Sequence, residues 1–164
     1  MSGETAVEGY DDAVSRFVER FAAELTEAGM QRMASRVFAA LLASEDGALT
    51  SAELSERLRI SPAAVSGAVR YLSQVSLVSR EREPGSRRDR YRVHSDVWYE
   101  TFTKRDAILA RWVKVLRDGV AALGEDTPAG LRVAETAEFM FFLENEMSSL
   151  LERWRAHRAT LDLG

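Results

Sequence analysis

Residues 49–80 read LTSAELSERLRISPAAVSGAVRYLSQVSLVSR, and this stretch decides the fold. Thr50 or Ser51 can cap a short helix over 52–58, because a side-chain oxygen at a helix start accepts a hydrogen bond from an unpaired backbone amide. Ser61 followed by Pro62 is a second helix start, since proline suits the first helical position. The helix expected from there to Val75 buries one apolar stripe. Two short helices joined by about three residues are typical of a helix-turn-helix.

The sequence period changes directly after this second helix. Residues 78–82 and 90–94 alternate in the manner of β-strands, and the segment EPGSRRD at 83–89 is rich in turn formers. These patterns predict a β-hairpin with a basic tip. In this context the hairpin is the wing of a winged helix.

Helical periodicity flanks the motif on both sides. We expect helices over 11–28 and 30–43, the second largely buried, a long helix from Asp96 to a break near Gly124, and a last helix over 131–161. The fold class expected is mainly α with a small β-hairpin wing. The chain, 1–164, is expected to be a single domain with N-terminal helices in 11–45, a DNA-binding winged helix in 46–95 and C-terminal dimerisation helices in 96–164.

Charge is segregated along the chain. Residues 57–92 contain nine arginines and three acids, a net charge of +6, whereas the whole chain carries −4. Such a basic middle between acidic arms favours a face that binds a polyanion. A solvated arginine-rich hairpin would have the same composition.

Composition argues against several other classes of function. The chain has no cysteine, so thiolate metal sites and nucleophilic thiols are excluded. His94 and His157 are the only histidines and lack metal-ligand spacing, and no glycine-rich phosphate loop is present. The longest apolar run, 139–143, is far shorter than the roughly 20 residues that span a bilayer. We therefore expect a cytoplasmic, non-enzymatic protein without a cofactor, a metal or a membrane segment.

The stretch 49–80, together with EPGSRRDRYRV at 83–93, resembles the winged helix of the MarR superfamily of bacterial transcriptional regulators. Arg70, the segment 87–89 and Tyr91, running into Trp98, are most similar to the GbsR-like branch. The resemblance implies a homodimer that binds a pseudo-palindromic operator in double-stranded DNA. It also implies a repressor that a small-molecule effector releases. The alternative is a winged-helix module that binds acidic protein partners without sequence-specific DNA binding.

Two positions depart from the family pattern. Ser76 stands where members usually have glycine at the end of the recognition helix, so a left-handed cap there would carry a small backbone penalty. Ser86 stands where many members have an acid that is thought to orient the paired wing arginines.

The residues expected to meet DNA lie on the recognition helix and the wing. Small side chains permit close approach, and Arg70 offers a fork that can read guanine. Glycine destabilises a helix interior relative to alanine. The presence of Gly67 in the recognition helix would be explained either by close approach to a DNA backbone or by tolerated sequence drift. The candidate DNA contacts are Thr50, Ser51, Ser61, Ala63, Ala64, Ser66, Gly67, Arg70, Arg87, Arg88 and Arg90. Rather than reading bases, a further set of wing arginines is expected either to position phosphates or to pair with Glu81, Glu83 and Asp89: Arg80, Arg82, Arg90 and Arg92.

Two further sets of apolar residues have candidate roles. The terminal helices are expected to form the dimer interface through Phe17, Phe21, Phe139, Leu143, Met147, Leu150 and Trp154. A candidate effector pocket between the DNA-binding and dimer helices is expected from Met30, Met33, Phe38, Trp98, Phe102 and Trp112. Plain core and dimer packing would also explain this second set.

Overall fold

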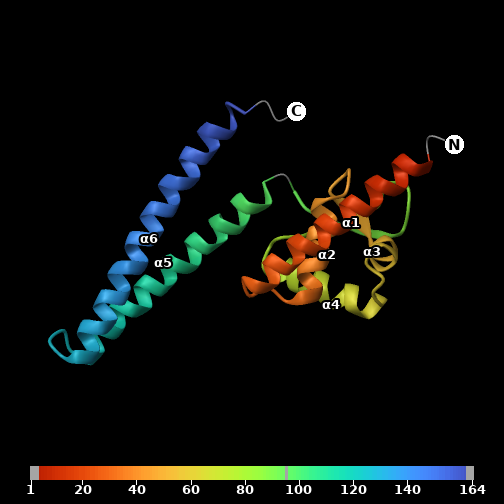
Figure 1. The fold of residues 1–164 in the computed structure, drawn as a ribbon. Coiled ribbons are helices and arrows are strands. Elements are labelled where there is room, and N and C mark those ends of the chain that lie inside the picture. Colours follow the sequence, from red (N-terminus) through yellow and green to blue (C-terminus); the bar gives the residue numbers. More distant parts are fainter. Residues whose placement is uncertain (1–3, 95, 162–164) are drawn as a thin grey trace. The chain divides into compact units, whose positions relative to one another are not determined.

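The computed structural model describes the backbone of residues 4–94 and 96–161, and the side chains of residues 12–94, 96–99, 101 and 105–161 (Figure 1). The chain divides into two compact units, residues 1–97 and 98–164. The elements of the first unit are α1 (Glu4–Glu27), α2 (Arg32–Leu42), β1 (Ala48–Thr50), α3 (Ser51–Leu58), α4 (Pro62–Gln74), β2 (Ser79–Arg82) and β3 (Asp89–Arg92). The second unit is formed by α5 (Val97–Leu123) and α6 (Pro128–Arg158). The expected class, mainly α with a small hairpin wing, is confirmed.

Helix α2 is the centre of the first unit. Phe38 and Leu41 have no exposed surface, and α2 packs against α1, α3 and α4. The core cluster adds Leu54 from α3 and Leu72 from α4. The prediction that this helix is largely buried is confirmed, although it begins at Arg32, after the glycine turn at Gly29, and not at residue 30.

A short strand that the sequence analysis did not predict joins the wing to the helix-turn-helix. Strand β1 pairs antiparallel with β3, placing Leu49 opposite Tyr91, and the sheet order is β1-β3-β2. Gly47 precedes the strand with a positive φ of 64°, and its carbonyl accepts a hydrogen bond from the Val93 amide at 2.8 Å. A Cβ at this glycine would lie 3.0 Å from the Val93 carbonyl oxygen, so the turn requires a residue without a side chain.

Three helices of the first unit end at a left-handed residue. These residues are Gly29 after α1, Arg59 after α3 and Ser76 after α4, with φ of 101°, 52° and 63°. At Ser76 the amide of Leu77 reaches the Leu72 carbonyl at 2.9 Å, and the Ser76 amide reaches Ser73 at 3.1 Å. This is a Schellman end, in which glycine is the usual residue. The left-handed cap that the family pattern implies at this position is therefore present at Ser76.

The second unit is a pair of long helices. Leu109 and Val113 of α5 and Ala137 of α6 are buried. Helix α6 begins at Pro128, three residues earlier than predicted, because the Thr127 hydroxyl accepts a hydrogen bond from the Gly130 amide at 3.0 Å and caps the helix.

Both tryptophans of α5 face solvent. The side chains of Trp98 and Trp112 are 45% and 53% exposed. Among the described residues of α5 in the second unit, Leu109 and Val113 are buried, whereas Val97 belongs to the core of the first unit. Tryptophan therefore does not mark the packed side of this helix.

Candidate nucleic-acid interface

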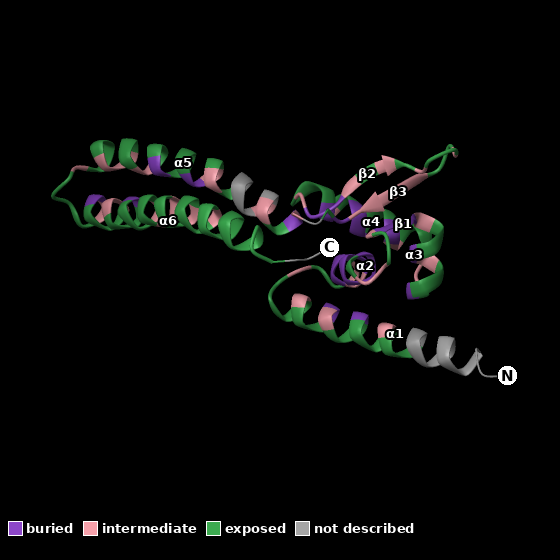
Figure 2. Cartoon of the chain, turned by 90° about the horizontal axis from the view of Figure 1, so that it is seen from above, coloured by how far each residue is buried: buried purple, intermediate pink, exposed green. Residues whose placement is uncertain are grey.

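Helix α4 has one buried side and one side that faces solvent. Val65, Ala68, Val69 and Leu72 lie in the core. The opposite side exposes the small residues and the arginine expected to meet DNA (Figure 2 colours the chain by burial). Ser61, Ala63, Ser66, Gly67 and Arg70 are exposed, and Ala64 is half-buried. The solvent-facing side of a recognition helix is the side that can enter a major groove.

The start of α4 is fixed by its own residues. The Ser61 hydroxyl accepts a hydrogen bond from the Ala64 amide at 3.1 Å, and Pro62 occupies the first turn. The predicted Ser-Pro helix start is therefore confirmed. It fixes the direction in which α4 leaves the turn after α3.

Thr50 caps α3 and does not face outward. Its hydroxyl accepts a hydrogen bond from the Glu53 amide at 3.3 Å and donates one to the Glu53 carboxylate at 2.9 Å, and the residue is 8% exposed. The backbone amide of Thr50 is the largest cause that lowers the pKa of Glu53. Thr50, and not Ser51, is therefore the N-cap of α3. The DNA contact expected of Thr50 does not agree with the burial of its side chain. Ser51 is half-buried beside it.

Most arginines on the wing strands are held by acids. Arg90 and Arg92 both bind the Glu81 carboxylate, at 2.5 Å and 2.9 Å, and Arg80 forms an ion pair with Asp89. The pKa of Glu81 is lowered, chiefly by the hydrogen bond from Arg92. Arg90 is thus engaged within the hairpin, as the alternative reading of this arginine proposed.

The tip of the wing is organised by backbone hydrogen bonds. The Glu83 amide reaches the Arg88 carbonyl at 2.8 Å, and the Ser86 amide reaches the Glu83 carbonyl at 3.1 Å. The Ser86 hydroxyl accepts a hydrogen bond from the Arg88 amide at 3.1 Å. Ser86, at the position where relatives often carry an acid, therefore orders the backbone of the tip. Arg87 and Arg88 are exposed there.

Fewer arginines of the wing are therefore unpaired than its composition alone indicates. Within the described part of the chain, no ion pair engages Arg70 on α4 or Arg87 and Arg88 on the wing tip. The acids of the hairpin meet the strand arginines instead. These three exposed arginines lie on the two elements that a winged helix uses to contact DNA, and Arg57, Arg59 and Arg82 nearby are exposed as well.

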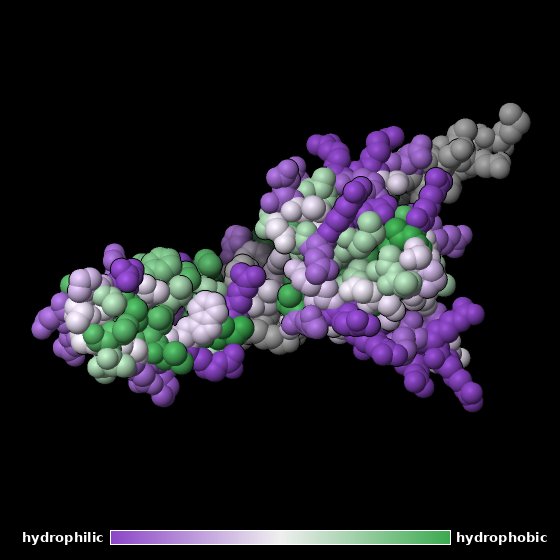
Figure 3. All heavy atoms as spheres, turned by 90° about the horizontal axis from the view of Figure 1, so that it is seen from below, coloured by the Kyte–Doolittle hydropathy of each residue, from purple (hydrophilic) through white to green (hydrophobic). Residues whose placement is uncertain are grey.

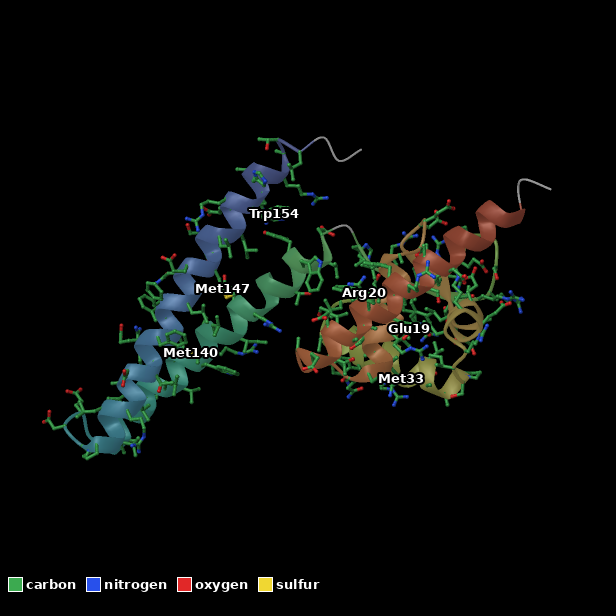
Figure 4. The ribbon with its side chains drawn as sticks, in the orientation of Figure 1. Glu19, Arg20, Met33, Met140, Met147 and Trp154 are labelled. Carbon is green, nitrogen blue, oxygen red and sulfur yellow. The ribbon has the colours of Figure 1, made fainter. Side chains whose placement is uncertain are left out.

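The residues expected at the dimer interface leave a large apolar surface exposed on α6. Of the expected residues, Phe139, Leu150 and Trp154 are 58%, 52% and 43% exposed, and Leu143 and Met147 are half-buried. The neighbouring Phe142, which was not among them, is 62% exposed. Figure 3 shows hydrophobic atoms gathered on the surface of this unit, and Figure 4 labels Met147 and Trp154 along α6. On α1, Phe17 is 48% exposed and stacks on Phe21 with ring centroids 6.0 Å apart.

The six candidate effector residues fall in both units and differ in exposure. Phe38 is fully buried in the core of the first unit, and Met30 and Met33 pack against that core. Trp98 and Trp112, in the second unit, are exposed. The side chain of Phe102 lies outside the described residues. The complete burial of Phe38 is that of an ordinary core residue.

Within each unit, described residues line an open hollow, and neither of these hollows is lined by the candidate effector residues. One, of ≈ 540 Å³, lies between α1 and α2. The other, of ≈ 350 Å³, lies between α5 and α6. Among the described residues, no group of three or more histidines or acids could hold a metal ion. The described helices include none that is long and apolar enough to cross a membrane.

Comparisons with known proteins agree with this geometry. A model of the MarR family matches residues 28–89, and a model of MmpR5-like MarR family transcriptional regulators matches residues 96–157. The chain is 25% identical over 147 residues to the HTH-type transcriptional regulator MmpR5 of Mycobacterium tuberculosis, covering 89% of each chain. The GbsR-like branch is not among these matches and stays a prediction.

Solved structures are similar as well. A crystal structure of a transcriptional regulator has 25% identity and a TM-score of 0.76, with 88% of this chain and 99% of that chain covered. Sco3205, a MarR family regulator from Streptomyces coelicolor solved in complex with DNA, has 21% identity and a TM-score of 0.41, with coverage of 96% and 90%. The chain is therefore similar to MarR family transcriptional regulators over both its winged helix and its two C-terminal helices.

Proposed function

We propose that this chain is a MarR family transcriptional regulator that binds double-stranded DNA through the exposed side of α4 and the tip of the wing. The observation that carries the proposal is which arginines of α4 and the wing are paired with acids. Arg70, Arg87 and Arg88 face solvent, whereas Arg80, Arg90 and Arg92 of the strands are held by Glu81 and Asp89. Ion pairs within the hairpin leave positive charge where a groove and its phosphates would meet it.

The three exposed arginines have different roles in this proposal. Arg70 stands beside the small residues of α4, so its guanidinium can approach a base edge and bind guanine with two hydrogen bonds. Arg87 and Arg88 project from the wing tip and contact phosphates or enter the adjacent minor groove. Arg70 therefore contributes to sequence preference, and the wing contributes mainly to affinity.

The proposal includes a homodimer on a pseudo-palindromic operator. The support is α6, whose exposed apolar residues include Phe139, Phe142, Leu150 and Trp154. Obligate interfaces bury roughly 2,000 Å² or more, and a second copy of the chain would cover such a surface. Sedimentation of the full chain at micromolar concentration should give a dimer, and a monomer would remove this part of the proposal.

A repressor role with release by a small molecule completes the proposal, as the family resemblance implies. Met30 and Met33 in the first unit and Trp98 and Trp112 in the second stay as candidate effector contacts. Transcription in vitro from a promoter that overlaps the bound site measures the sign of regulation. Reduced transcription supports repression, and increased transcription contradicts it.

The DNA-binding proposal is tested with three arginine variants on operator and scrambled duplexes across a salt series. Arg70→Ala should lose roughly 1–3 kcal/mol on the operator and relax preference at one position. Arg88→Ala should weaken both duplexes and flatten the salt dependence by about one unit. Arg132→Ala, an exposed arginine on α6, is the matched control and should leave affinity unchanged. Unchanged affinity in both winged-helix variants would favour a protein-interaction module.

A further inference from the structure

Arg59 has a backbone conformation that suits glycine or asparagine better than arginine. It follows the last residue of α3 with φ of 52° and ψ of 48°, in the left-handed region. The Schellman hydrogen bonds are present, because the Arg59 amide reaches the Glu56 carbonyl at 3.3 Å and the Ile60 amide reaches the Ser55 carbonyl at 3.1 Å. These bonds need the left-handed backbone and not the arginine side chain. The choice of residue therefore needs another reason.

A cation at a helix C-terminus can stabilise the helix dipole, but α3 already has other cations at this end. Arg57 lies in its last turn. The Arg36 guanidinium, held by Glu19 at 2.7 Å, donates a hydrogen bond to the Leu58 carbonyl at 3.0 Å. The Ser55 hydroxyl also closes the turn by donating to the Ile60 carbonyl at 2.5 Å. The end of α3 thus has its partners without the Arg59 side chain.

The Arg59 side chain is exposed and has no intramolecular use in the described part of the chain. No ion pair or side-chain hydrogen bond engages it there, in contrast to Arg36, Arg80, Arg90 and Arg92. A non-glycine residue that keeps a left-handed backbone without a local gain is typical of a functional position. Its position is equally informative, because Arg59 lies in the turn between α3 and α4, two residues before the Ser61 cap (Figure 1).

We propose that Arg59 contacts a DNA phosphate beside the groove that α4 enters. This inference rests on the proposed function and adds a contact residue to it. A guanidinium binds phosphate oxygens through two parallel hydrogen bonds and stays charged at all physiological pH values. A phosphate contact from the turn fixes the depth and direction of α4 without reading sequence. A contact of this kind would explain why arginine is kept at a position whose backbone conformation favours glycine or asparagine.

The test uses two substitutions of Arg59 and one control. Arg59→Asn removes the charge and keeps a residue that tolerates the left-handed region, and Arg59→Lys keeps the charge. Ser76→Asn introduces the same residue at the other left-handed non-glycine position of this unit and leaves the charge unchanged. Each full-length protein is titrated with operator and scrambled duplexes between 50 and 200 mM salt, and its melting temperature is measured without DNA.

Arg59→Asn should weaken binding to both duplexes by the same factor. Loss of one phosphate contact reduces the slope of log affinity against log salt concentration by about 0.9. The difference in affinity between the natural chain and Arg59→Asn should therefore shrink about threefold between 50 and 200 mM salt. Arg59→Lys and Ser76→Asn should keep the slope of the natural chain, and Arg59→Asn should melt no lower than that chain. An unchanged slope in Arg59→Asn overturns the proposal, as does a fall in melting temperature that accounts for the lost affinity.

The outcomes separate this inference from the function on which it rests. If the natural chain binds neither duplex, the proposed function fails and the phosphate contact fails with it. If the chain binds DNA and Arg70→Ala weakens it while Arg59→Asn does not, only the contact from the turn is wrong.

Discussion

Replacing Gly67 with alanine should stabilise the fold and weaken DNA binding. Gly67 lies inside α4, is exposed, and has no heavy atom within 4 Å of the position that a Cβ would take. Nothing in the first unit therefore requires glycine here. Alanine is roughly 0.8–1.0 kcal/mol better than glycine in a helix interior, so the free energy of unfolding should rise by about that amount. For a domain of about 60–100 residues, this raises the melting temperature by roughly 4–8 °C.

The same methyl group should be unfavourable against DNA. If α4 packs into a groove at Gly67, overpacking by one methyl costs roughly 1–3 kcal/mol, which is about five- to 150-fold in affinity. Thermal and urea unfolding by circular dichroism measure the first effect, and operator binding measures the second. Gly119→Ala is the matched control, because this glycine lies inside α5 and a Cβ there would make an ordinary contact, 3.8 Å from Val133. It should change stability alone.

Opposite signs are the diagnostic result. A Gly67→Ala protein that is more stable and binds the operator as well as the natural chain would refute close approach at this position and make Gly67 tolerated drift. A less stable Gly67→Ala protein would show that the fold itself requires glycine at this position, although no atom lies within 4 Å of the added Cβ.

Three other substitutions test the fold. Gly130→Ala places a Cβ 1.9 Å from the Gly124 carbonyl oxygen, so the second unit should lose about 2 kcal/mol or more, and a natural melting curve would contradict this. Thr50→Ala removes the cap of α3 and should cost about 0.5–2 kcal/mol in urea unfolding; lost DNA affinity with unchanged stability would restore Thr50 as a contact. The pKa of Glu81 is lowered by Arg92 and Arg90 from 4.5, so its stabilisation is present above that pH and disappears as pH falls through the folded value. The stability difference between the natural chain and Glu81→Gln should therefore be largest near neutral pH and close in acid, and a difference independent of pH would refute the ion-pair network.

The helix-turn-helix was predictable because its signals are local. Ser61 and Pro62 mark a helix start within two residues, and the buried stripe of α4 follows from its period. The left-handed end at Ser76 was expected only from the family resemblance, because serine itself carries no signal for that backbone conformation.

Strand β1, the pairing of Arg90 and the exposure of Trp112 depend on tertiary contacts, which the periodicity of the sequence does not reveal. Strand β1 has three residues, all buried, and so shows no alternation. The engagement of Arg90 depends on a hairpin register that sets it opposite Glu81, and a shift of one residue would place a different side chain there. The exposure of Trp112 depends on which side of α5 meets α6, and an aromatic residue alone does not determine that side.

Thr50 belongs to two elements at once, and this limits how the molecule can adapt to DNA. It ends β1, where it pairs with Arg90 of the wing, and it caps α3 through Glu53. A wing that tilted as a flap would have to break either the strand pairing or the cap. We therefore expect the distance between the wing and the helix-turn-helix to be nearly constant. Adjustment to a target would fall on the DNA, so that sequences whose grooves already have the right separation, or deform easily to it, are preferred at base pairs that no side chain touches.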